Sequence, residues 1–275
     1  MNRLTDCHCH SDNSFDAKDS VAKMASTAQS LGLYAFCITD HCDLYVPGQN
    51  KNAECFDGDM LAPILRSVNQ MKEYRENAAG DTKLLCGIEL GQASQDPEKA
   101  KEILQSADFD FVLGSLHNLA CEEDFFFMQF DKLDTKEILT RYFNELIDIC
   151  TLGMFDSLAH ITYPIRYIIG KYKIAVNIDD YKPLTDKILT MLVKSGKAFE
   201  LNTSPIRNNI DVIGMDKKLL ARYKALGGEY VTVGSDAHNT HDIASDIPTA
   251  YDIIRSVGID RVTIFEKRKP ITIKI

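Results

Sequence analysis

Short apolar segments alternate with longer segments of helical period along nearly the whole 275-residue chain. Strands are expected at 4–10, 33–39, 83–91, 109–118, 155–161, 198–204 and 229–238. Helices are expected at 20–32, 58–79, 96–107, 135–153, 179–196, 216–228 and 243–258, with Gly32 closing the first and Pro97 in the first turn of the third. This alternation predicts an α/β fold with a parallel sheet, because parallel strands need a crossover connection that is usually a helix.

Two architectures fit such an alternation, a closed barrel and an open doubly wound sheet. The chain shows no linker, low-complexity tract or internal repeat, so we expect one domain over residues 1–275. An open sheet would gather its ligands at one switch point. Here polar residues follow most of the strands, as in a TIM-like barrel whose active site lies at the carboxyl ends of the strands. The distribution of these polar residues over most of the strands therefore favours a barrel of about seven strand–helix units.

Charge and hydropathy narrow the class of protein. The formal net charge is −9, which disfavours sequence-independent binding to nucleic acid. No apolar run approaches the ~20 residues that span a membrane, and the polar start "MNRLTD" lacks the apolar region of a secretory signal. The 8 cysteines are scattered, so we expect reduced thiols in a cytoplasmic protein.

Metal-capable side chains crowd the segment "TDCHCHSDNSFD" at residues 5–16. Side chains alternate between the two faces of a strand, so His8 and His10 are expected to point together while Cys7 and Cys9 point away. In a barrel the two imidazoles would face the interior. The two thiols would then pack beneath the helices as core residues.

Six of the 7 histidines follow or end predicted strands, and two carboxylates join them. The set is His8, His10, His41, Glu89, His117, His160, Asp236 and His238. It is too large for one tetrahedral ion and predicts two or three divalent ions, with a carboxylate such as Glu89 bridging two of them. Imidazole with carboxylate suits Zn, Mn or Fe. The remaining histidine, His241, lies in a loop and is expected at the surface.

The motifs "DCHCH", "TDHCD", "GIELG", "GSLHN", "LAHI", "ELNTS" and "GSDAH" together resemble the polymerase and histidinol phosphatase (PHP) superfamily, in the family's order. Each motif is short, but the ordered set is specific and runs through the chain. The length and the spacing are most similar to the stand-alone histidinol-phosphate phosphatases, as is the tail "FEKRKP". The resemblance implies a single PHP metallophosphatase domain, folded as a distorted (β/α)7 barrel with a trinuclear metal site.

The resemblance also implies which residues bind which ion. The first ion would take His8, His10, Glu89 and Asp236. Glu89 would bridge to a second ion that His117 and His160 complete. The third would take His41, His238 and Asp16, which stands where many members have a histidine. A carboxylate there is a harder ligand than imidazole and makes the third site more tolerant of Mn or Mg. Asp12 is the alternative ligand in the same loop.

The expected reaction is hydrolysis of a phosphate monoester by metal-bound hydroxide, and the resemblance implies that L-histidinol phosphate is converted to L-histidinol and phosphate in histidine biosynthesis. Bound ions would lower the pKa of water and neutralise phosphoryl charge. Glu89, Asp236 and His238 are the expected catalytic residues. Asp236, His238 or a water that they orient would protonate the leaving alkoxide, and the choice among them stays open.

Phosphate recognition calls for guanidinium groups. Arg166 and Arg207 fall in segments expected to be loops at the catalytic mouth, where bidentate contacts are possible. Asn202 and Ser204 are expected either to bond the substrate or brace a ligand, or else to pack and cap. The segment "CEEDFFFMQFD" at 121–131 is read as a loop whose Phe residues close the barrel, with a substrate lid as the alternative.

Three other functions remain open on the sequence. A phosphoesterase of the same superfamily could act on nucleotides or other small phosphate esters. A C–N hydrolase of the amidohydrolase type also opens with an HxH motif, although it uses a later carboxylate or a carboxylated lysine as its bridge. A non-catalytic metal-binding domain would be expected to lack ligands, and this chain has the full set. The partner expected in every enzymatic case is a small molecule, with neither nucleic acid nor membrane.

Overall fold

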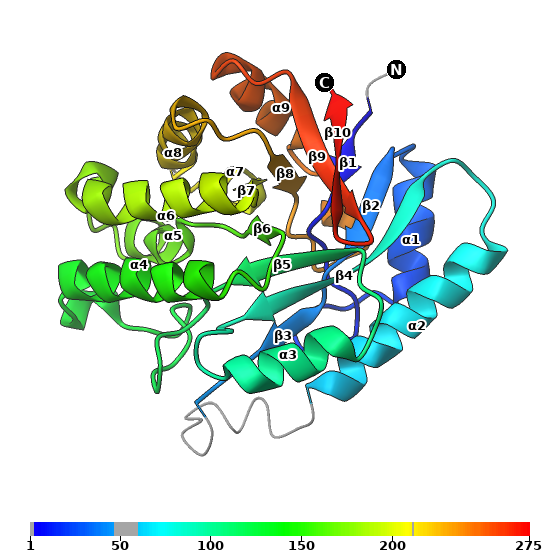
Figure 1. Cartoon of the computed structure of the whole chain (residues 1–275), viewed down its shortest axis with the longest axis horizontal. Helices are drawn as coiled ribbons and strands as arrows, with labels where there is room; N and C mark the ends of the chain where they lie inside the picture. Colours follow the sequence, from blue (N-terminus) through cyan, green and yellow to red (C-terminus); the bar gives the residue numbers. More distant parts are fainter. Residues whose placement is uncertain (1–2, 47–59, 211) are drawn as a thin grey trace.

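The computed structural model describes residues 3–46, 60–210 and 212–275 and has a mostly parallel barrel at its centre (Figure 1). The barrel strands are β1 (Thr5–Asp6), β2 (Ala35–Ile38), β3 (His41–Asp43), β4 (Lys83–Gly91), β5 (Phe111–Ser115), β6 (Ser157–Leu158), β7 (Ala198–Asn202) and β8 (Val231–Gly234). They follow the order β1-β2-β4-β5-β6-β7-β8, and β3 continues the course of β2 alongside β4. The predicted α/β barrel is confirmed.

The barrel closes between its first and last strands. The Cys7 N–H donates to the Val233 carbonyl at 2.9 Å, and the Asp236 N–H donates to the His8 carbonyl at 2.8 Å. These bonds join the first and last barrel strands along the chain. An open doubly wound sheet would leave both of these strands as edges, so the alternative architecture is excluded.

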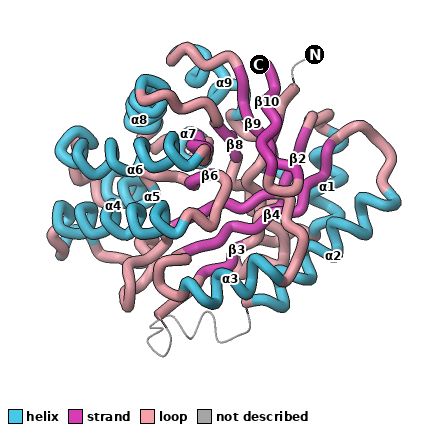
Figure 2. Tube along the Cα trace, in the orientation of Figure 1, coloured by secondary structure: helices cyan, strands magenta, loops and turns pink. Residues whose placement is uncertain are grey.

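Helices surround the barrel (Figure 2). They are α1 (Val21–Ser30), α2 (Leu61–Asn77), α3 (Pro97–Gln105), α4 (Thr135–Leu152), α5 (Tyr163–Gly170), α6 (Lys182–Ser195), α7 (Ser204–Arg207), α8 (Ile213–Ala225) and α9 (Ile247–Ser256), with short 3₁₀ turns at Phe130–Lys132, Ile178–Tyr181 and Thr240–Asp242. Local signals set their ends. The Asp134 side chain caps α4 by accepting two backbone N–H bonds, and Gly153 ends that helix in the left-handed conformation.

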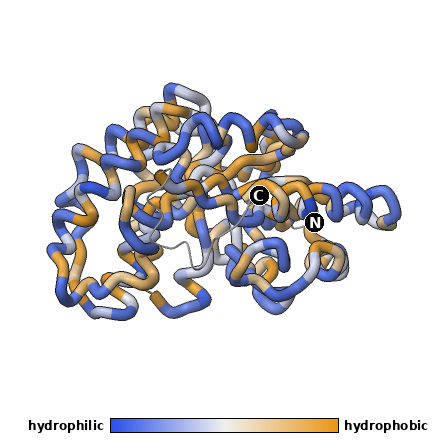
Figure 3. Tube along the Cα trace, turned by 90° about the horizontal axis from the view of Figure 1, so that it is seen from below, coloured by the Kyte–Doolittle hydropathy of each residue, from blue (hydrophilic) through white to orange (hydrophobic). Residues whose placement is uncertain are grey.

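The apolar core lies inside the barrel and between its strands and the helices. All residues of β2, β5 and β7 are buried, as parallel strands covered on both faces require. Figure 3 shows hydrophobic colour along the central strands, while the outer helices alternate between hydrophobic and hydrophilic. Cys7 and Cys9 are buried free thiols, in agreement with the expected core role, and burial raises the pKa of the Cys9 thiol well above its ordinary value.

An antiparallel hairpin of β9 (Arg261–Glu266) and β10 (Lys269–Lys274) packs at the amino ends of the barrel strands. The Phe265 ring stacks on Phe111, the first residue of β5, with ring centroids 5.3 Å apart. Thr263 accepts a bond from the Val231 N–H at the start of β8. The hairpin therefore covers the end of the barrel opposite the carboxyl ends of the strands.

The structure departs from the expected elements in several places. His41–Asp43 forms the short strand β3, which was not expected. The first strand ends at Asp6, so His8 and His10 lie in the extended segment beyond it. Arg166 and Arg207 lie on the short helices α5 and α7, which were expected to be loops. No strand was predicted in the tail, where β9 and β10 form a hairpin. Residues 58 and 59 of the second predicted helix lie outside the described residues, and no described helix is both long and apolar enough to cross a membrane.

Candidate metal centre and active site

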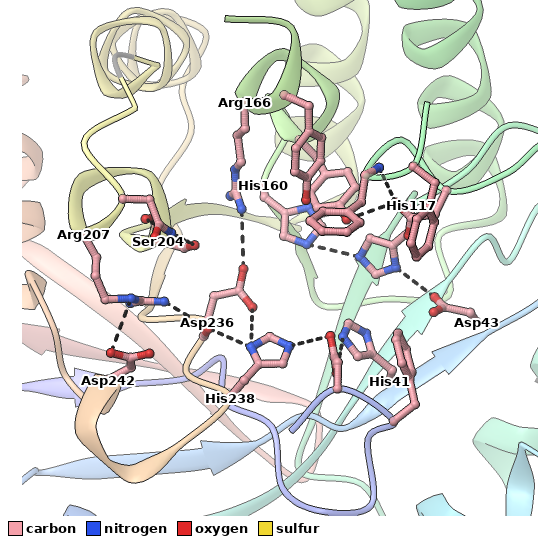
Figure 4. A pocket seen from close by; sticks show the side chains of 18 residues that line it. His41, Asp43, His117, His160, Arg166, Ser204, Arg207, Asp236, His238 and Asp242 are labelled. Carbon is pink, nitrogen blue, oxygen red and sulfur yellow. Dashed lines mark hydrogen bonds and ion pairs between the residues drawn. The ribbon is translucent and has the colours of Figure 1, made fainter. Parts of the chain in front are cut away.

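The predicted metal ligands converge at the carboxyl ends of the barrel strands, beside a cavity of about 510 Å³ (Figure 4). Most follow their strands within a few residues: His8 and His10 after β1, His117 after β5, His160 after β6, and Asp236 and His238 after β8. His41 begins β3, and Glu89 lies near the end of β4. Because parallel strands bring their carboxyl ends together, residues far apart in the sequence meet here.

Four atoms around the first candidate position are spaced as ligands of one ion would be. The Nε2 atoms of His8 and His10 lie 3.5 Å and 3.6 Å from Glu89 Oε2, and 3.6 Å and 3.4 Å from Asp236 Oδ1. A tetrahedral ion with bonds of about 2.1 Å separates its ligand atoms by about 3.4 Å. Both Nε2 atoms are buried without a hydrogen-bond partner, and Glu89 Oε2, which also lies 2.8 Å from His41 Nδ1, is fully buried, so a cation fits this position.

The other oxygen of Glu89 faces a second pair of imidazoles. Glu89 Oε1 lies 3.1 Å from His117 Nε2 and 2.8 Å from His160 Nε2, and these two nitrogens lie 3.5 Å apart. A carboxylate whose two oxygens face two separate groups of imidazoles has the arrangement of a bridging ligand. The donor set at both positions suits a divalent ion such as zinc.

A third, more open group contains His41, His238 and Asp16. His238 Nε2 lies 3.1 Å from Asp16 Oδ2, and His41 Nε2 lies 3.8 Å from Asp16 Oδ1. The Asp16 side chain is 40% exposed, whereas Glu89 is fully buried. Asp12, the alternative, is an exposed residue that forms no ion pair with these imidazoles. The structure therefore brings Asp16 to the third group.

The carboxylates and imidazoles shift one another's pKa values. Against the effect of burial, Glu200 and Asp236 raise the pKa of His8, and Asp43 and Glu89 raise the pKa of His117. Burial works to raise the pKa of Glu89, but His117, His8 and His41 outweigh it and hold this pKa well below its ordinary value. The pKa of Asp236 is likewise held well below the ordinary value by His8, His10 and His238 against the effect of burial. Burial, together with His41 and His238, lowers the pKa of His10. Ionised carboxylates and neutral imidazoles are the ligand forms, so an ion that binds here would release protons from imidazoles such as those of His8 and His117.

Two carboxylates that the sequence analysis missed orient the ligands. Glu200 on β7 lies 2.6 Å from His8 Nδ1 through one oxygen and accepts the His160 backbone N–H at 2.8 Å through the other. Asp43 lies 2.9 Å from His117 Nδ1. A carboxylate that accepts the Nδ1 proton leaves the lone pair on Nε2, where the metal would bind. The sequence offers only a weak hint, because Asp43 shares a strand face with His41 and Glu200 shares one with Asn202, as any alternate residue of these strands would.

Backbone geometry around the centre is specialised. A Cβ on Gly234 would lie 2.2 Å from the Cβ of His8, so only glycine allows β8 to approach the first histidine so closely. Asp236 and His160 adopt positive φ angles of 57° and 23°, which are uncommon for residues with a side chain. Such strain is typical of functional sites and is maintained here by the surrounding barrel.

Arg166 borders the same cavity and is nearly completely buried. Its Nη1 lies 3.5 Å from Asp236 Oδ2, while its Nε and Nη2 have no hydrogen-bond partner among the described residues. Asp236 raises the pKa of Arg166 although burial alone would lower it, so the guanidinium stays charged. A buried cation with two unpaired donors is costly unless an anion accepts them.

The other predicted substrate-binding residues have different partners. Arg207 lines the cavity, but its guanidinium donates to the carbonyls of Ser235 at 2.9 Å and Asp236 at 3.4 Å. Asn202 donates to Asp236 Oδ2 at 3.2 Å and accepts the Ser204 N–H at 3.0 Å, which makes it a brace for Asp236. Ser204 itself lines the cavity. His241 is exposed, as expected.

The loop at 121–131 divides its aromatic side chains between the core and the cavity. Phe125 and Phe130 are buried, which agrees with the favoured interpretation that this loop closes the barrel. Phe126 and Phe127 are each 53% exposed and line the cavity together with Asp124. Burial raises the pKa of Asp124 to about 6. The loop thus forms one wall of the site as well as a cap.

Comparisons with known proteins agree with this architecture. The PHP domain model matches residues 6–204. A probable histidinol-phosphatase of Clostridium acetobutylicum is 28% identical over 96% of this chain and 97% of its own length. The histidinol-phosphatase of Lactococcus lactis is 26% identical over 96% of this chain and 95% of its own length.

Solved structures share the fold. The histidinol phosphate phosphatase of Lactococcus lactis, crystallised with zinc, L-histidinol and phosphate, superposes with a TM-score of 0.76 at 24% identity, covering 98% of this chain and 99% of that one. A histidinol phosphatase of Listeria monocytogenes, described as putative, superposes with a TM-score of 0.74 at 17% identity, covering 89% of this chain and 99% of that one. The family model matches well over half of the residues, and the barrel carries the family's motifs at one end. The chain belongs to the PHP domain family.

Proposed function

We propose that this protein is a metal-dependent phosphatase that hydrolyses L-histidinol phosphate to L-histidinol and phosphate. The observation that carries the proposal is the buried Arg166, which has two unpaired guanidinium nitrogens and lines the same cavity as a cluster of metal-binding groups. Relatives named histidinol-phosphatase match this chain over nearly its whole length. The reaction would serve histidine biosynthesis in the cytoplasm.

The centre would hold two or three divalent ions, with Zn, Mn or Fe suited to the donor set. Glu89 bridges the first and second positions, and the third is the most open of them. When bound, the ions lower the pKa of water and neutralise charge on the phosphoryl oxygens. The protein's part is to hold the ligands rigidly and to keep the inner positions out of bulk solvent, since His8, His10 and Glu89 have no exposed surface.

Arg166 would bind the phosphoryl group. Its Nε and Nη2 atoms can donate two parallel bonds to phosphate oxygens, which is the geometry that guanidinium favours. Arg207 already donates to the 235–236 backbone through Nη1 and Nη2, and its Nε lies 3.6 Å from Asp242 Oδ1. It would therefore contribute positive charge at the mouth of the cavity. Ser204 lines the cavity near it and can donate one further bond.

Asp236 stays ionised, so it is best placed to orient a water that would deliver a proton to the leaving oxygen. One of its oxygens faces His8 and His10, and the other faces Arg166 and Asn202, so it stands between the metal centre and the phosphoryl site. His238 is less suited. The Nδ1 of His238 lies 3.0 Å from the backbone carbonyl of Asp236. A carbonyl oxygen only accepts, so Nδ1 carries the proton and the lone pair lies on Nε2, which faces the third position.

The wall opposite Arg207 would receive the alcohol half of the substrate. Phe126, Phe127, Tyr163 and Tyr167 supply aromatic surface, and Asp124 supplies a largely desolvated carboxylate. Aromatic rings and a carboxylate together attract a flat or cationic group, and histidinol carries an imidazole and an ammonium. This chemistry favours histidinol phosphate over nucleotides, whose bases bring no matching cation. None of the described cavity-lining residues is a lysine, which removes support for a C–N hydrolase bridged by a carboxylated lysine.

The test is phosphate release from L-histidinol phosphate by Zn- or Mn-loaded protein, measured beside nucleoside monophosphates and sugar phosphates. We expect a strong preference for histidinol phosphate. Similar low rates on every ester would leave the phosphatase chemistry intact but contradict the proposed substrate. Absence of phosphate release from all of them would refute the phosphatase proposal.

A further inference from the structure

A turn at residues 11–14, in which Ser11, Asn13 and Ser14 are buried, links the first metal-binding segment to the end of β2. Its anchor is Asp40, a fully buried residue between β2 and β3. Asp40 Oδ1 accepts the Ser11 backbone N–H at 2.6 Å and lies 2.8 Å from Ser14 Oγ. Its Oδ2 accepts the hydroxyls of Ser11 and Ser67, the latter from helix α2. None of these contacts was anticipated from the sequence.

The direction of each hydrogen bond around Ser14 follows from the donors available. A backbone N–H can only donate, so Asp40 Oδ1 is an acceptor, and the single hydroxyl proton of Ser14 is directed at it. The Ser14 oxygen must then accept from its other two neighbours. These are the His41 backbone N–H at 3.0 Å and His10 Nδ1 at 3.3 Å.

The tautomer of His10 is thereby determined. Its Nδ1 carries a proton that is donated to Ser14, so its lone pair lies on Nε2. That nitrogen is buried without a hydrogen-bond partner and faces Asp236 Oδ1 at 3.4 Å and Glu89 Oε2 at 3.6 Å. In the opposite tautomer a proton would occupy the place where the first ion is expected.

We infer that Ser14, oriented by Asp40, is a positioning residue that holds His10 in its metal-binding tautomer and ties the backbone of His41 to the same oxygen. One hydroxyl thus couples a ligand of the first ion to a ligand of the third. The inference rests on the proposed metal centre. It concerns a proton that is present before any ion binds, so it can be tested independently of phosphatase activity.

The test is the tautomer of His10 in metal-free protein, read from long-range proton–nitrogen NMR of histidine-labelled samples well above the ordinary imidazole pKa of about 6.5. The His10 signals are assigned by their absence in a His10→Gln sample. We expect Nδ1 to be protonated in the native protein. In Ser14→Ala we expect the population to shift toward protonated Nε2, and zinc affinity to fall about 10- to 100-fold, the usual effect of removing a partner that orients a metal ligand.

Ser67→Ala is the matched control, because Ser67 also donates to Asp40 but bonds only its Oδ2, whereas the hydroxyl beside His10 Nδ1 is that of Ser14. It should leave both the His10 tautomer and the zinc affinity unchanged. Circular dichroism and thermal unfolding of both variants separate a local effect from misfolding. A native His10 protonated on Nε2, or an equal loss of zinc affinity in the two serine variants, would overturn the inference. Loss of phosphatase activity without a change of tautomer would likewise contradict it.

Discussion

Replacing Glu89 by Gln tests the bridging role at the heart of the proposed centre. One Glu89 oxygen faces His117 and His160, and the other faces His8 and His10 at 3.5 Å and 3.6 Å. The second oxygen also lies 2.8 Å from His41 Nδ1. The amide has nearly the same volume, but it carries no charge and places an NH₂ group at one of the two positions. One ion would lose its ligand, and the other would keep only a neutral oxygen.

The size of the effect follows from the burial of the pair. Removing one partner from a buried charged interaction costs about 3–5 kcal/mol. At about 1.4 kcal/mol per factor of ten, kcat/KM should fall roughly 100- to 5,000-fold. Bound metal per chain, measured by elemental analysis after dialysis, should fall in the same variant. Circular dichroism should show a folded barrel, because the substitution changes charge and leaves shape nearly unchanged.

The matched control is Glu145→Gln, which makes the same change at a partly buried carboxylate that does not line the cavity. Glu145 accepts hydrogen bonds from Gln95 at 2.8 Å and Ser94 at 3.3 Å. The metal content and kcat/KM of the Glu145→Gln variant should stay at the native level. Unchanged turnover and metal content in Glu89→Gln would refute the bridging cluster. An equal loss in the two variants would trace the effect to general destabilisation instead.

Three further predictions address the remaining groups. Arg166→Lys removes the planar pair of donors, so kcat/KM should fall about 10- to 100-fold by steady-state kinetics, in line with about 1.5–3 kcal/mol for bonds to a charged group; an unchanged value would contradict phosphate binding by Arg166. Asp124→Asn should raise KM for histidinol phosphate about tenfold by weakening a charged hydrogen bond while leaving KM for p-nitrophenyl phosphate unchanged; equal changes for both esters would exclude recognition of the cation. Burial raises the pKa of Asp216 from 3.8 to about 6, so the folded protein binds the extra proton and its stability falls as pH rises from about 4 to about 6. Asp216→Asn should therefore stabilise the metal-free protein above pH 6 by up to about 3 kcal/mol in urea unfolding while remaining near neutral below pH 4, and a gain confined to low pH would reverse this reasoning.

The features that repeat along the chain were readable from the sequence. The alternation of apolar and helical segments predicted the barrel, because each unit carries its own signal and many units agree. The two-residue spacing of His8 and His10 predicted that both would face one centre, and their Nε2 atoms do face the same two carboxylates. Histidines at strand ends were informative because the fold itself gathers strand ends in one place.

Features that depend on a partner elsewhere in the chain were missed. Asp43 and Glu200 carry no local signal that distinguishes an orienting carboxylate from any other, and only the folded barrel shows which imidazole each one meets. Helix α5, which carries Arg166, was missed because it is short and mostly apolar and so shows no clear helical period. The hairpin of β9 and β10 was overlooked. Its two strands pair with each other locally, but the hairpin packs on the amino ends of strands that are distant in the sequence.

The seam between the first and last barrel strands has a consequence for how the protein is made. The bonds that close it tie Asp6 to Ser235, which are 229 residues apart, and the same seam holds His8 beside Asp236. During synthesis the amino-terminal imidazoles therefore leave the ribosome long before the carboxylate that completes their site. Contacts this distant in sequence form late in folding. Tight uptake of the first ion should accordingly wait for the finished chain, and a nascent chain halted before β8 should bind zinc only weakly through its exposed histidines and thiols.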